Sequence, residues 1–459
     1  MNDYGRPTYA HPAIIYLLVA LPLVFFLSWW RQPIGVPDEW AHIARAAQLA
    51  DGIFFTEVAS PGLPAQASID PSFHAFVRQV HEQRFTPISQ TMDSFRAATW
   101  STERVLTNNN AGVYFPGAYL FSIITLLATR QAGGSIVATL EWVSLINGIA
   151  CILIVAAAIL ITPSGKWAFL VVGSLPMSLF LFASASPDGI LISGAILMAA
   201  LAIRIWTDEL IHLWQAILIT IIATIIVSTK IPYLPVFAAA LLCGFFFVRK
   251  GEDQITLVAN KRHFLLLAGC LAVLIIIPVA WLIASKAGEI AVGGYNAGNT
   301  SEQIDFLIYN PLSIIHVAVV TMQNFGLMHL YQLIGNLGWL DAPLPFTCYV
   351  YLIATLIAVI VLDGNSVASR KIRLALLLSV FLTVGAVYLS LYASINEVGS
   401  LDGIVGVQGR YFLPLLPFLA CCMPALPIRN DWGVVTIALS AVGVSSYALV
   451  ATIVTRYYM

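Results

Sequence analysis

The chain has 459 residues, of which 59% are hydrophobic and only 10% are charged, and its formal net charge is −1. Soluble globular domains carry about 25% charged residues, so this composition excludes a soluble protein and indicates an integral membrane protein. The near-zero net charge gives no basis for a nucleic-acid partner. The six cysteines lie in or beside apolar runs, which favours buried thiols over a disulfide framework or a zinc site.

The first apolar run covers residues 13–30 and is long enough to span a bilayer. It ends in two tryptophans and Arg31 and has no small-residue cleavage site, so we interpret it as a retained membrane helix and not as a signal peptide. Together with the later runs it predicts about eleven spans, since each run is close to the roughly 20 residues that a bilayer core requires. The predicted spans lie at 13–30, 137–161, 167–184, 189–206, 211–228, 232–248, 264–284, 346–362, 374–393, 411–427 and 433–453.

A shorter apolar segment at 114–129 decides the predicted topology. If the N-terminus is cytoplasmic and this segment lies on the outer membrane surface, most basic residues of the short loops fall on the cytoplasmic side, as the positive-inside rule requires. If the segment crosses, the same residues move outside. The basic residues concerned are Lys166, Arg204, Arg249, Lys250, Lys261, Arg262, Arg370, Lys371, Arg373 and Arg429. We therefore predict a cytoplasmic N-terminus and an outer C-terminus.

Two long segments, 31–136 and 285–345, form outer loops in this topology. The first contains "PSFHAFVRQVHEQRF" and the second contains "EQIDFLIYNPLSIIHVAVVTMQNF". Both stretches are amphipathic, which is typical of helices that lie in the membrane interface. No low-complexity linker divides the chain. The sequence thus predicts an all-α polytopic membrane protein that forms a single domain over residues 1–459.

Five polar motifs lie beside predicted helix ends, all on the predicted outer face. They are "PDEWAH" at 37–42, "SASPDG" at 184–189, "STKIPY" at 228–233, "GWLDAP" at 338–343 and "VQGRYFLP" at 407–414. Ionisable groups near the bilayer are energetically costly and are therefore functional candidates. The convergence of five such motifs on one face predicts a functional site there.

The first motif places two acids, Asp38 and Glu39, at the start of a predicted helix. Asp38 and His42 are one helical turn apart and share a face. A carboxylate beside a histidine can act as a general base or bind a cation. The alternative interpretation is a solvated helix cap. Asp38, Glu39 and Asp188 are the candidate catalytic residues.

Each of the other motifs also has a structural alternative. Asp188 can cap the helix that it begins, and Lys230 can extend its ammonium to the interface from a helix end. Arg410 presents a fork that suits phosphate, although with Tyr411 it can equally anchor the chain in the interface. Asp341 can simply form a turn. The candidate substrate-binding residues are His42, Lys230, Tyr233, Asp341, Gln408, Arg410 and Tyr411.

Acids and a few cations beside the outer ends of predicted membrane helices favour an amphiphilic substrate that carries a phosphate. Group transfer from such a substrate needs a carboxylate that accepts a proton and a cation that stabilises the departing phosphate. The chain has no phosphate-cradling GxxxxGK[ST] motif and no dinucleotide-binding GxGxxG motif. Together with the outward acids, this argues against a cytosolic nucleotide substrate.

The motifs resemble those of a bacterial membrane-protein family numbered 2142 among the domains of unknown function. The matching segments are "PDEWAH" with the later "ADG", "SPDG", "TKIPYLP", "GWLDAPLP" and "QGRYFLPLLP", in this order over residues 37–420. The chain also resembles the GT-C superfamily of glycosyltransferases, whose first span precedes an acidic motif and a long outer loop with interfacial helices. Asp38 and Glu39 match that first acidic site, Asp188 matches a second acid after the third span, and 114–129 matches an interfacial helix.

The resemblance implies an inverting transfer of sugar from a polyprenyl-phosphate donor to a cell-envelope glycan, at the non-cytoplasmic face of the bacterial inner membrane. It implies that Asp38 activates the acceptor hydroxyl, and that Lys230 and Arg410 hold the leaving phosphate. Glu39 and Asp188 would orient the acceptor or, with Asp38, hold Mg²⁺ or Mn²⁺, which some members of the superfamily need and others do not. Two alternatives stay open: a transporter or flippase of lipid-linked glycans, and a polymerase or ligase that joins them.

Overall fold

The computed structural model describes residues 10–56, 66–208, 212–244, 246–248, 255–257, 261–286, 300–364, 368–424 and 431–459. Over these residues the chain is mostly helical and has three small antiparallel pairs of strands. Seven of the described helices are long and apolar enough to cross a membrane. They are α1 (Pro12–Trp30), α6 (Ile136–Ile161), α9 (Asp188–Asp208), α12 (Lys261–Ala284), α14 (Ser313–Ile334), α16 (Arg370–Ile395) and α18 (Asp431–Tyr458). The prediction of a helical membrane protein is confirmed at this level.

The other predicted spans coincide with shorter or interrupted helices. These are α7 (Lys166–Ser174) with α8 (Pro176–Phe182), α10 (Leu213–Thr229), α11 (Leu234–Gly244), α15 (Phe346–Leu362) and α17 (Leu416–Cys422). The break between α7 and α8 occurs at Leu175, whose backbone is extended. Proline disfavours the helical conformation in the residue before it, so Pro176 explains the break. The number of helices that cross the membrane stays a prediction from the sequence.

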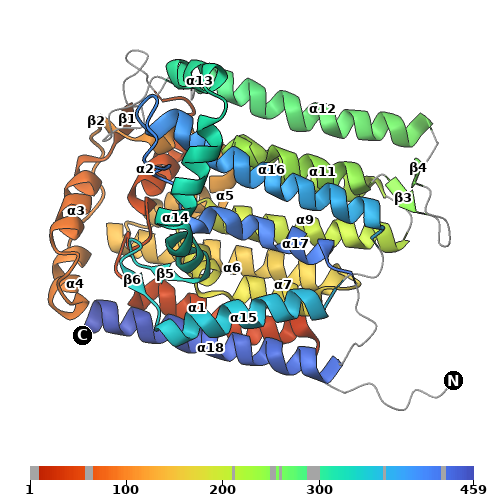
Figure 1. Ribbon diagram of the computed structural model, residues 1–459. Helices are drawn as coiled ribbons and strands as arrows, with labels where there is room; N and C mark the ends of the chain where they lie inside the picture. The colour runs from red at the N-terminus through yellow and green to blue at the C-terminus, as the bar shows by residue number, and fades with distance from the viewer. Residues whose placement is uncertain are drawn as a thin grey trace.

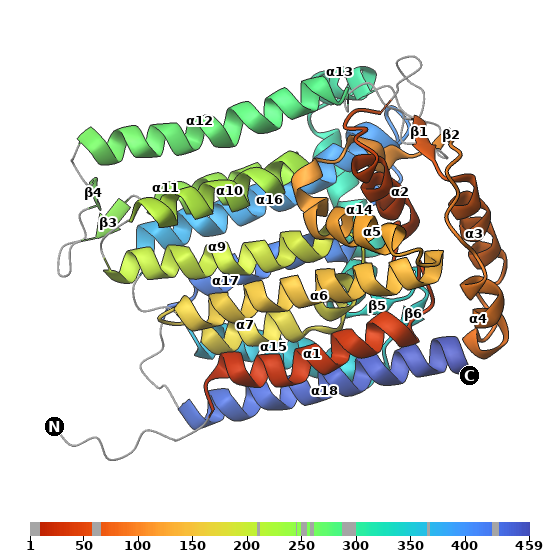
Figure 2. The same cartoon turned by 180° about the vertical axis from the view of Figure 1, so that it is seen from behind.

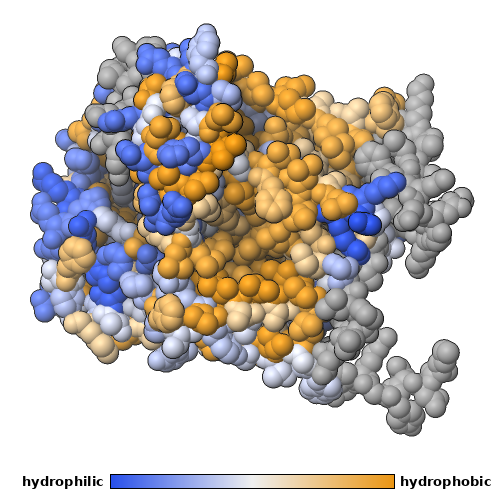
Figure 3. Space-filling model, in the orientation of Figure 1, coloured by the Kyte–Doolittle hydropathy of each residue, from blue (hydrophilic) through white to orange (hydrophobic). Residues whose placement is uncertain are grey.

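Apart from α14, the long helices lie side by side with their axes in a common direction (Figures 1 and 2). One end of this bundle carries α2 (Glu39–Ala50), α3 (Pro71–Glu82), α4 (Ile88–Arg96) and the C-terminus. The opposite end carries the short strands β3 (Phe246–Val248) and β4 (Ile255–Leu257). The face seen in Figure 3 is predominantly apolar between these two ends. Such an apolar surface is what the hydrocarbon core of a bilayer requires.

The segment at 114–129 contains the 3₁₀ turn η2 (Pro116–Tyr119) and most of the helix α5 (Leu120–Gln131). Another 3₁₀ turn, η1 (Asn110–Val113), lies just before it. The α5 helix has 12 residues, which corresponds to about 18 Å. A hydrocarbon core is about 30 Å thick, so α5 is too short to cross it. The helices α11 and α17, which coincide with predicted spans, are also shorter than the core, so the non-spanning location of the segment 114–129 stays a prediction from the sequence.

The predicted amphipathic stretches both form helices. The first gives α3, which buries Phe73 and Phe76, and the second gives α13 (Thr300–Tyr309) and then α14. The length and composition of α14 would also allow it to cross a membrane. Figure 1 shows, however, that α14 runs steeply across the long helices near the α2 end of the bundle. Two further strand pairs lie near this end, β1 (Gln66–Ile69) with β2 (Val105–Asn108) and β5 (Asn336–Leu337) with β6 (Ala342–Pro343).

Close helix packing relies on small side chains in the bundle interior. A Cβ atom at Gly148 of α6 would overlap the side chain of Val24 in α1, so glycine there lets the two helices approach, as small residues do in membrane bundles. All six cysteines are free and buried, as the sequence indicated. Of the basic residues used to predict topology, Arg249, Lys250 and Arg429 lie outside the described residues.

Candidate functional site

Four of the predicted residues from distant parts of the chain meet in one cluster: Asp38, Asp188, Lys230 and Arg410. Arg410 Nη2 donates to Asp38 Oδ2 at 2.8 Å, and Arg410 Nη1 lies 3.6 Å from Asp188 Oδ2. Lys230 Nζ donates to Asp188 Oδ1 at 2.5 Å. The cluster joins the loop before α2, the first residue of α9, the end of α10 and the 3₁₀ segment η5 (Gly409–Leu415). We call these four residues the charged cluster.

Asp38 has an unusual backbone conformation. Its φ of 61° lies in the left-handed region, and although it occupies the position that precedes α2, its side chain accepts no hydrogen bond from that helix. The left-handed conformation costs a residue other than glycine about 1–2 kcal/mol. Such strain persists only where the surroundings enforce it, and it is concentrated at functional sites. The carboxylate therefore turns toward Arg410 and does not cap the helix.

The members of the charged cluster differ in their exposure. The side chains of Arg410, Asp188 and Lys230 are 2%, 7% and 18% exposed, whereas that of Asp38 is 58% exposed. Burying a charge is costly unless it is paired, and here two carboxylates balance two cations. Arg410 also donates to the carbonyl of Pro37 at 3.2 Å, which holds the strained turn. Asp38 is thus the member best placed to meet a second molecule.

Two predicted tyrosines adjoin the cluster. The ammonium of Lys230 lies 4.3 Å from the ring centroid of Tyr411, a cation–π distance. The hydroxyl of Tyr233 donates to the carbonyl of Tyr411 at 2.8 Å. Tyr233 is buried, and its hydrogen bond to the carbonyl of Tyr411 holds the backbone of η5 in position. Tyr411 is the tyrosine that remains partly accessible.

His42 lies beside the cluster without a hydrogen bond to it. Its Nδ1 is 2.8 Å from the hydroxyl of Tyr119, and its ring stacks on Tyr114 at 5.6 Å. Burial lowers the pKa of the imidazole to about 4, and the negative charges of Asp38 and Asp188 oppose this shift only in part. His42 is therefore neutral at neutral pH. The two tyrosines were not selected from the sequence, although they are the first and last residues of the aromatic "YFPGAY" segment.

The lowered pKa of His42 predicts a specific loss of stability in acid. The folded state holds the imidazole neutral down to about pH 4, whereas an unfolded chain protonates it near 6.5. The unfolded state thus binds more protons between these values, so stability declines as pH falls from 6.5 toward 4, by on the order of 3 kcal/mol in the limit. The measurement is the unfolding midpoint in detergent as a function of pH, for the wild type and for His42→Gln. As the pH falls from 6.5 toward 4, the midpoint of the variant should fall less steeply than that of the wild type. Equal slopes would contradict the prediction.

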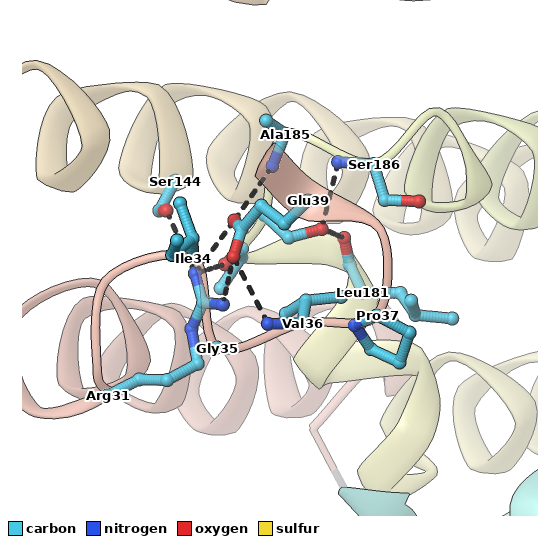
Figure 4. A network of polar contacts seen from close by, with 12 residues as sticks. Arg31, Ile34, Gly35, Val36, Pro37, Glu39, Ser144, Leu181, Ala185 and Ser186 are labelled. Atoms are coloured by element: carbon cyan, nitrogen blue, oxygen red, sulfur yellow. Dashed lines mark hydrogen bonds and ion pairs between the residues drawn. The ribbon is translucent and has the colours of Figure 1, made fainter. Parts of the chain in front are cut away.

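Glu39 points away from the charged cluster, although it follows Asp38 directly. Its carboxylate accepts two hydrogen bonds from the guanidinium of Arg31, at 2.6 and 3.0 Å. It also accepts from the backbone N–H groups of Val36 and Ala185, each at 3.2 Å. Figure 4 shows this enclosed network, in which Arg31 reaches Ser144 on α6 as well. Glu39 is buried and joins the first loop to the turn before α9.

Asp341 belongs to a third group of contacts. Its Oδ2 accepts from Arg456 at 2.8 Å, and its Oδ1 accepts from the N–H of Trp339 at 2.9 Å. Asp341 thus closes the turn between β5 and β6, which is the structural alternative that its motif allowed. The indole of Trp339 donates to the carbonyl of Ile34 at 2.8 Å, so this turn supports the loop that leads to Asp38.

Gln408 immediately precedes η5. Its side-chain Oε1 is buried and has no hydrogen-bond partner among the described residues. A buried acceptor without a partner is costly, so an added donor at this position would be stabilising. Gln408 therefore stays a predicted binding residue next to Arg410.

Comparison with known proteins identifies the family. The model of the family described as "Predicted membrane protein (DUF2142)" matches residues 22–419. The chain belongs to this family. The matched residues include every member of the charged cluster. No curated protein and no solved structure matches the chain.

The carboxylates selected for Mg²⁺ or Mn²⁺ have side-chain cations as partners. Asp38 and Asp188 bind Arg410 and Lys230, and Glu39 binds Arg31. Across the described part of the chain, no group of three or more His, Cys, Asp or Glu side chains could hold a metal ion. The positive charge beside these carboxylates is thus that of the chain's own lysine and arginine side chains.

Proposed function

We propose that this member of the DUF2142 family transfers a sugar from a polyprenyl-phosphate-linked donor to a glycan of the cell envelope. The observation that carries the proposal is the exposed Asp38 carboxylate, which a strained backbone and the buried Arg410 hold in place at one end of an apolar helix bundle. A second acid, Asp188, and the partly exposed Lys230 lie beside it. The resemblance of these positions to the acidic sites of the GT-C superfamily supports the same function.

The proposed reaction uses the groups in separate roles. Asp38 accepts the proton of the acceptor hydroxyl while the hydroxyl oxygen bonds to the anomeric carbon of the sugar. The bond from that carbon to the phosphate oxygen breaks, and polyprenyl phosphate leaves with the electron pair. Lys230, the more exposed of the two cations, stabilises the phosphate. Arg410 orients Asp38, and Asp188 holds both cations.

The distribution of charge supports an outward site. The positive-inside rule favours a cytoplasmic location for the basic loops of the chain, which leaves the α2 end of the bundle on the non-cytoplasmic side of the proposed bacterial inner membrane. A transporter would be expected to carry its charges near the membrane midplane. The location of α2 at one end of the bundle (Figure 1) supports transfer over transport.

Replacing Asp38 by asparagine is expected to slow sugar transfer about 10²–10⁴-fold, which is the usual contribution of a general base. The substitution keeps the shape of the side chain, and Asp188 still lies beside both Lys230 and Arg410, so the variant should fold, with an unfolding midpoint lowered by the loss of one negative charge from the cluster. The measurement is release of polyprenyl phosphate from polyprenyl-phosphate glucose, mannose and galactose, by purified protein in nanodiscs supplied with a cell-envelope glycan extract.

Asp51→Asn is the matched control, because Asp51 lies just after the other end of α2 and pairs with Arg104 and Arg130. This variant should transfer at the wild-type rate. If Asp38→Asn also kept that rate, Asp38 would not be the base. If the wild type released no polyprenyl phosphate from any of these donors, sugar transfer from them would be excluded.

A further inference from the structure

A histidine–tyrosine pair beside the charged cluster has no role in the proposed reaction. The Nδ1 atom of His42 lies 2.8 Å from the hydroxyl oxygen of Tyr119. Tyr119 is completely buried, and its hydroxyl has no other hydrogen-bond partner among the described residues. A neutral imidazole carries its proton on Nδ1 or on Nε2, so this contact can be donated by either residue.

The burial of Tyr119 decides which residue donates. If Nδ1–H donated to the phenol oxygen, the phenol proton would be buried without an acceptor among the described residues, at a cost of about 1–3 kcal/mol. If the hydroxyl donates to Nδ1, both groups are satisfied. The hydrogen bond at one nitrogen of a histidine fixes the state of the other. The proton of the His42 imidazole therefore lies on Nε2.

The Nε2 atom of His42 has no hydrogen-bond partner among the described residues, and it is not one of the enclosed side-chain atoms that lack a partner. This edge of the ring thus retains accessible surface, although the residue as a whole is only 6% exposed. His42 comes one helical turn after Asp38, so the two residues share a face of α2. A neutral N–H donor and the exposed Asp38 carboxylate therefore lie on the same face.

A second histidine–tyrosine pair provides an internal reference. The Nδ1 atom of His329 lies 2.9 Å from the hydroxyl of Tyr388, much as in the first pair. The imidazole of His329 also forms a hydrogen bond with the backbone of Val407. His329 thus has a second partner inside the protein, whereas the described residues provide none for His42.

We propose that the Nε2–H of His42 binds the acceptor hydroxyl, and that Tyr119 is a positioning residue that fixes the required tautomer. A hydroxyl group both donates and accepts hydrogen bonds. Asp38 takes its proton, Nε2–H binds one lone pair of its oxygen, and the other lone pair attacks the anomeric carbon. The identity of this oxygen rests on the proposed function, whereas the tautomer rests on the contact with Tyr119. A phosphate oxygen fits less well, because the Asp38 carboxylate would repel it.

Nitrogen NMR of the full-length protein in nanodiscs, with isotope-labelled histidine, measures the tautomer at neutral pH. The signals that disappear in His42→Gln are those of His42. We expect a protonated Nε2 and an unprotonated Nδ1. Tyr119→Phe removes the bond to Nδ1, so the Nδ1 signal should move while the signals of His329 stay unchanged. A protonated Nδ1 in the wild type, or an unmoved Nδ1 signal in Tyr119→Phe, would overturn the proposal.

The double variant His42→Phe with Tyr119→Phe tests the donor. It replaces both polar partners by apolar groups of similar shape, an exchange that can be nearly neutral for stability. The concentration of cell-envelope glycan extract that gives half-maximal transfer should rise about tenfold, and that of the lipid-linked donor should not change. His42→Gln, which keeps an N–H at the end of its side chain, should retain most of the affinity for the extract. An unchanged value for the extract, or a rise for the lipid-linked donor alone, would overturn the hydroxyl contact.

The NMR spectra also separate this inference from the proposed function. Adding the glycan extract to the wild type should move the Nε2 signal of His42 and leave the signals of His329 in place. This movement without release of polyprenyl phosphate from any donor would support the hydroxyl contact and contradict sugar transfer alone. An unmoved Nε2 signal, or an equal movement at His329, would overturn the hydroxyl contact.

Discussion

Replacing Glu39 by glutamine is expected to lower the free energy of unfolding by about 3–5 kcal/mol, because it leaves a buried charge on Arg31 without a counter-charge. Both residues are buried, and their two hydrogen bonds are short. The glutamine oxygen can still accept from the N–H of Val36 or Ala185, so the loss concerns mainly the guanidinium. Thermal unfolding in detergent micelles measures the effect.

Two variants separate this effect from a general loss of charge. Asp208→Asn breaks the exposed pair of Arg204 and Asp208 on α9, and exposed pairs of this spacing contribute about 0.3–0.5 kcal/mol. Adding Arg31→Met to Glu39→Gln removes the unpaired charge, so the double variant should regain most of the lost stability. A stable Glu39→Gln protein that fails to transfer sugar would instead assign Glu39 to the chemistry, as the acidic motif alone suggested.

The predicted helices follow from a strong constraint on the sequence. A chain in hydrocarbon must satisfy its backbone hydrogen bonds internally, so long apolar runs form helices whatever their neighbours are. The break at Leu175 was not predicted, because hydropathy is insensitive to it, although Pro176 carries the signal. The steep direction of α14 was not predicted either, since an amphipathic stretch specifies a buried face and gives no direction relative to other helices.

For the charged cluster, the sequence predicted that the motifs lie on one face of the protein, but not which side chains pair with one another. Sequence and charge indicated that Asp38, Asp188, Lys230 and Arg410 share one face, but tertiary packing decides which partners pair. The neighbouring acids show this most clearly. The left-handed backbone of Asp38 separates its carboxylate from that of Glu39, and the two then bind different arginines. No spacing in the sequence distinguishes these roles.

Replacing Gly409 by alanine is expected to disrupt the placement of Arg410. A Cβ atom at Gly409 would overlap the backbone carbonyl of His329 on α14 and lie 2.7 Å from the backbone nitrogen of Leu333. Backbone atoms inside a helix cannot move aside as a flexible side chain can. Because of this overlap, η5 must shift away from α14 in the variant. The shift would break the hydrogen bond that the N–H of Gly409 donates to Gln332 at 2.8 Å.

The shift should cost about 1–3 kcal/mol of stability, as overpacking usually does. It should also reduce the proposed sugar transfer, because Arg410 would no longer hold Asp38. Gly443→Ala is the matched control: its Cβ meets open space within α18, and the exchange should stabilise a helix by up to about 1 kcal/mol. Unfolding midpoints and transfer rates of both variants test the pair. Wild-type stability in Gly409→Ala would contradict the close approach of η5 to α14, and with it the contact that sets Arg410 beside both aspartates.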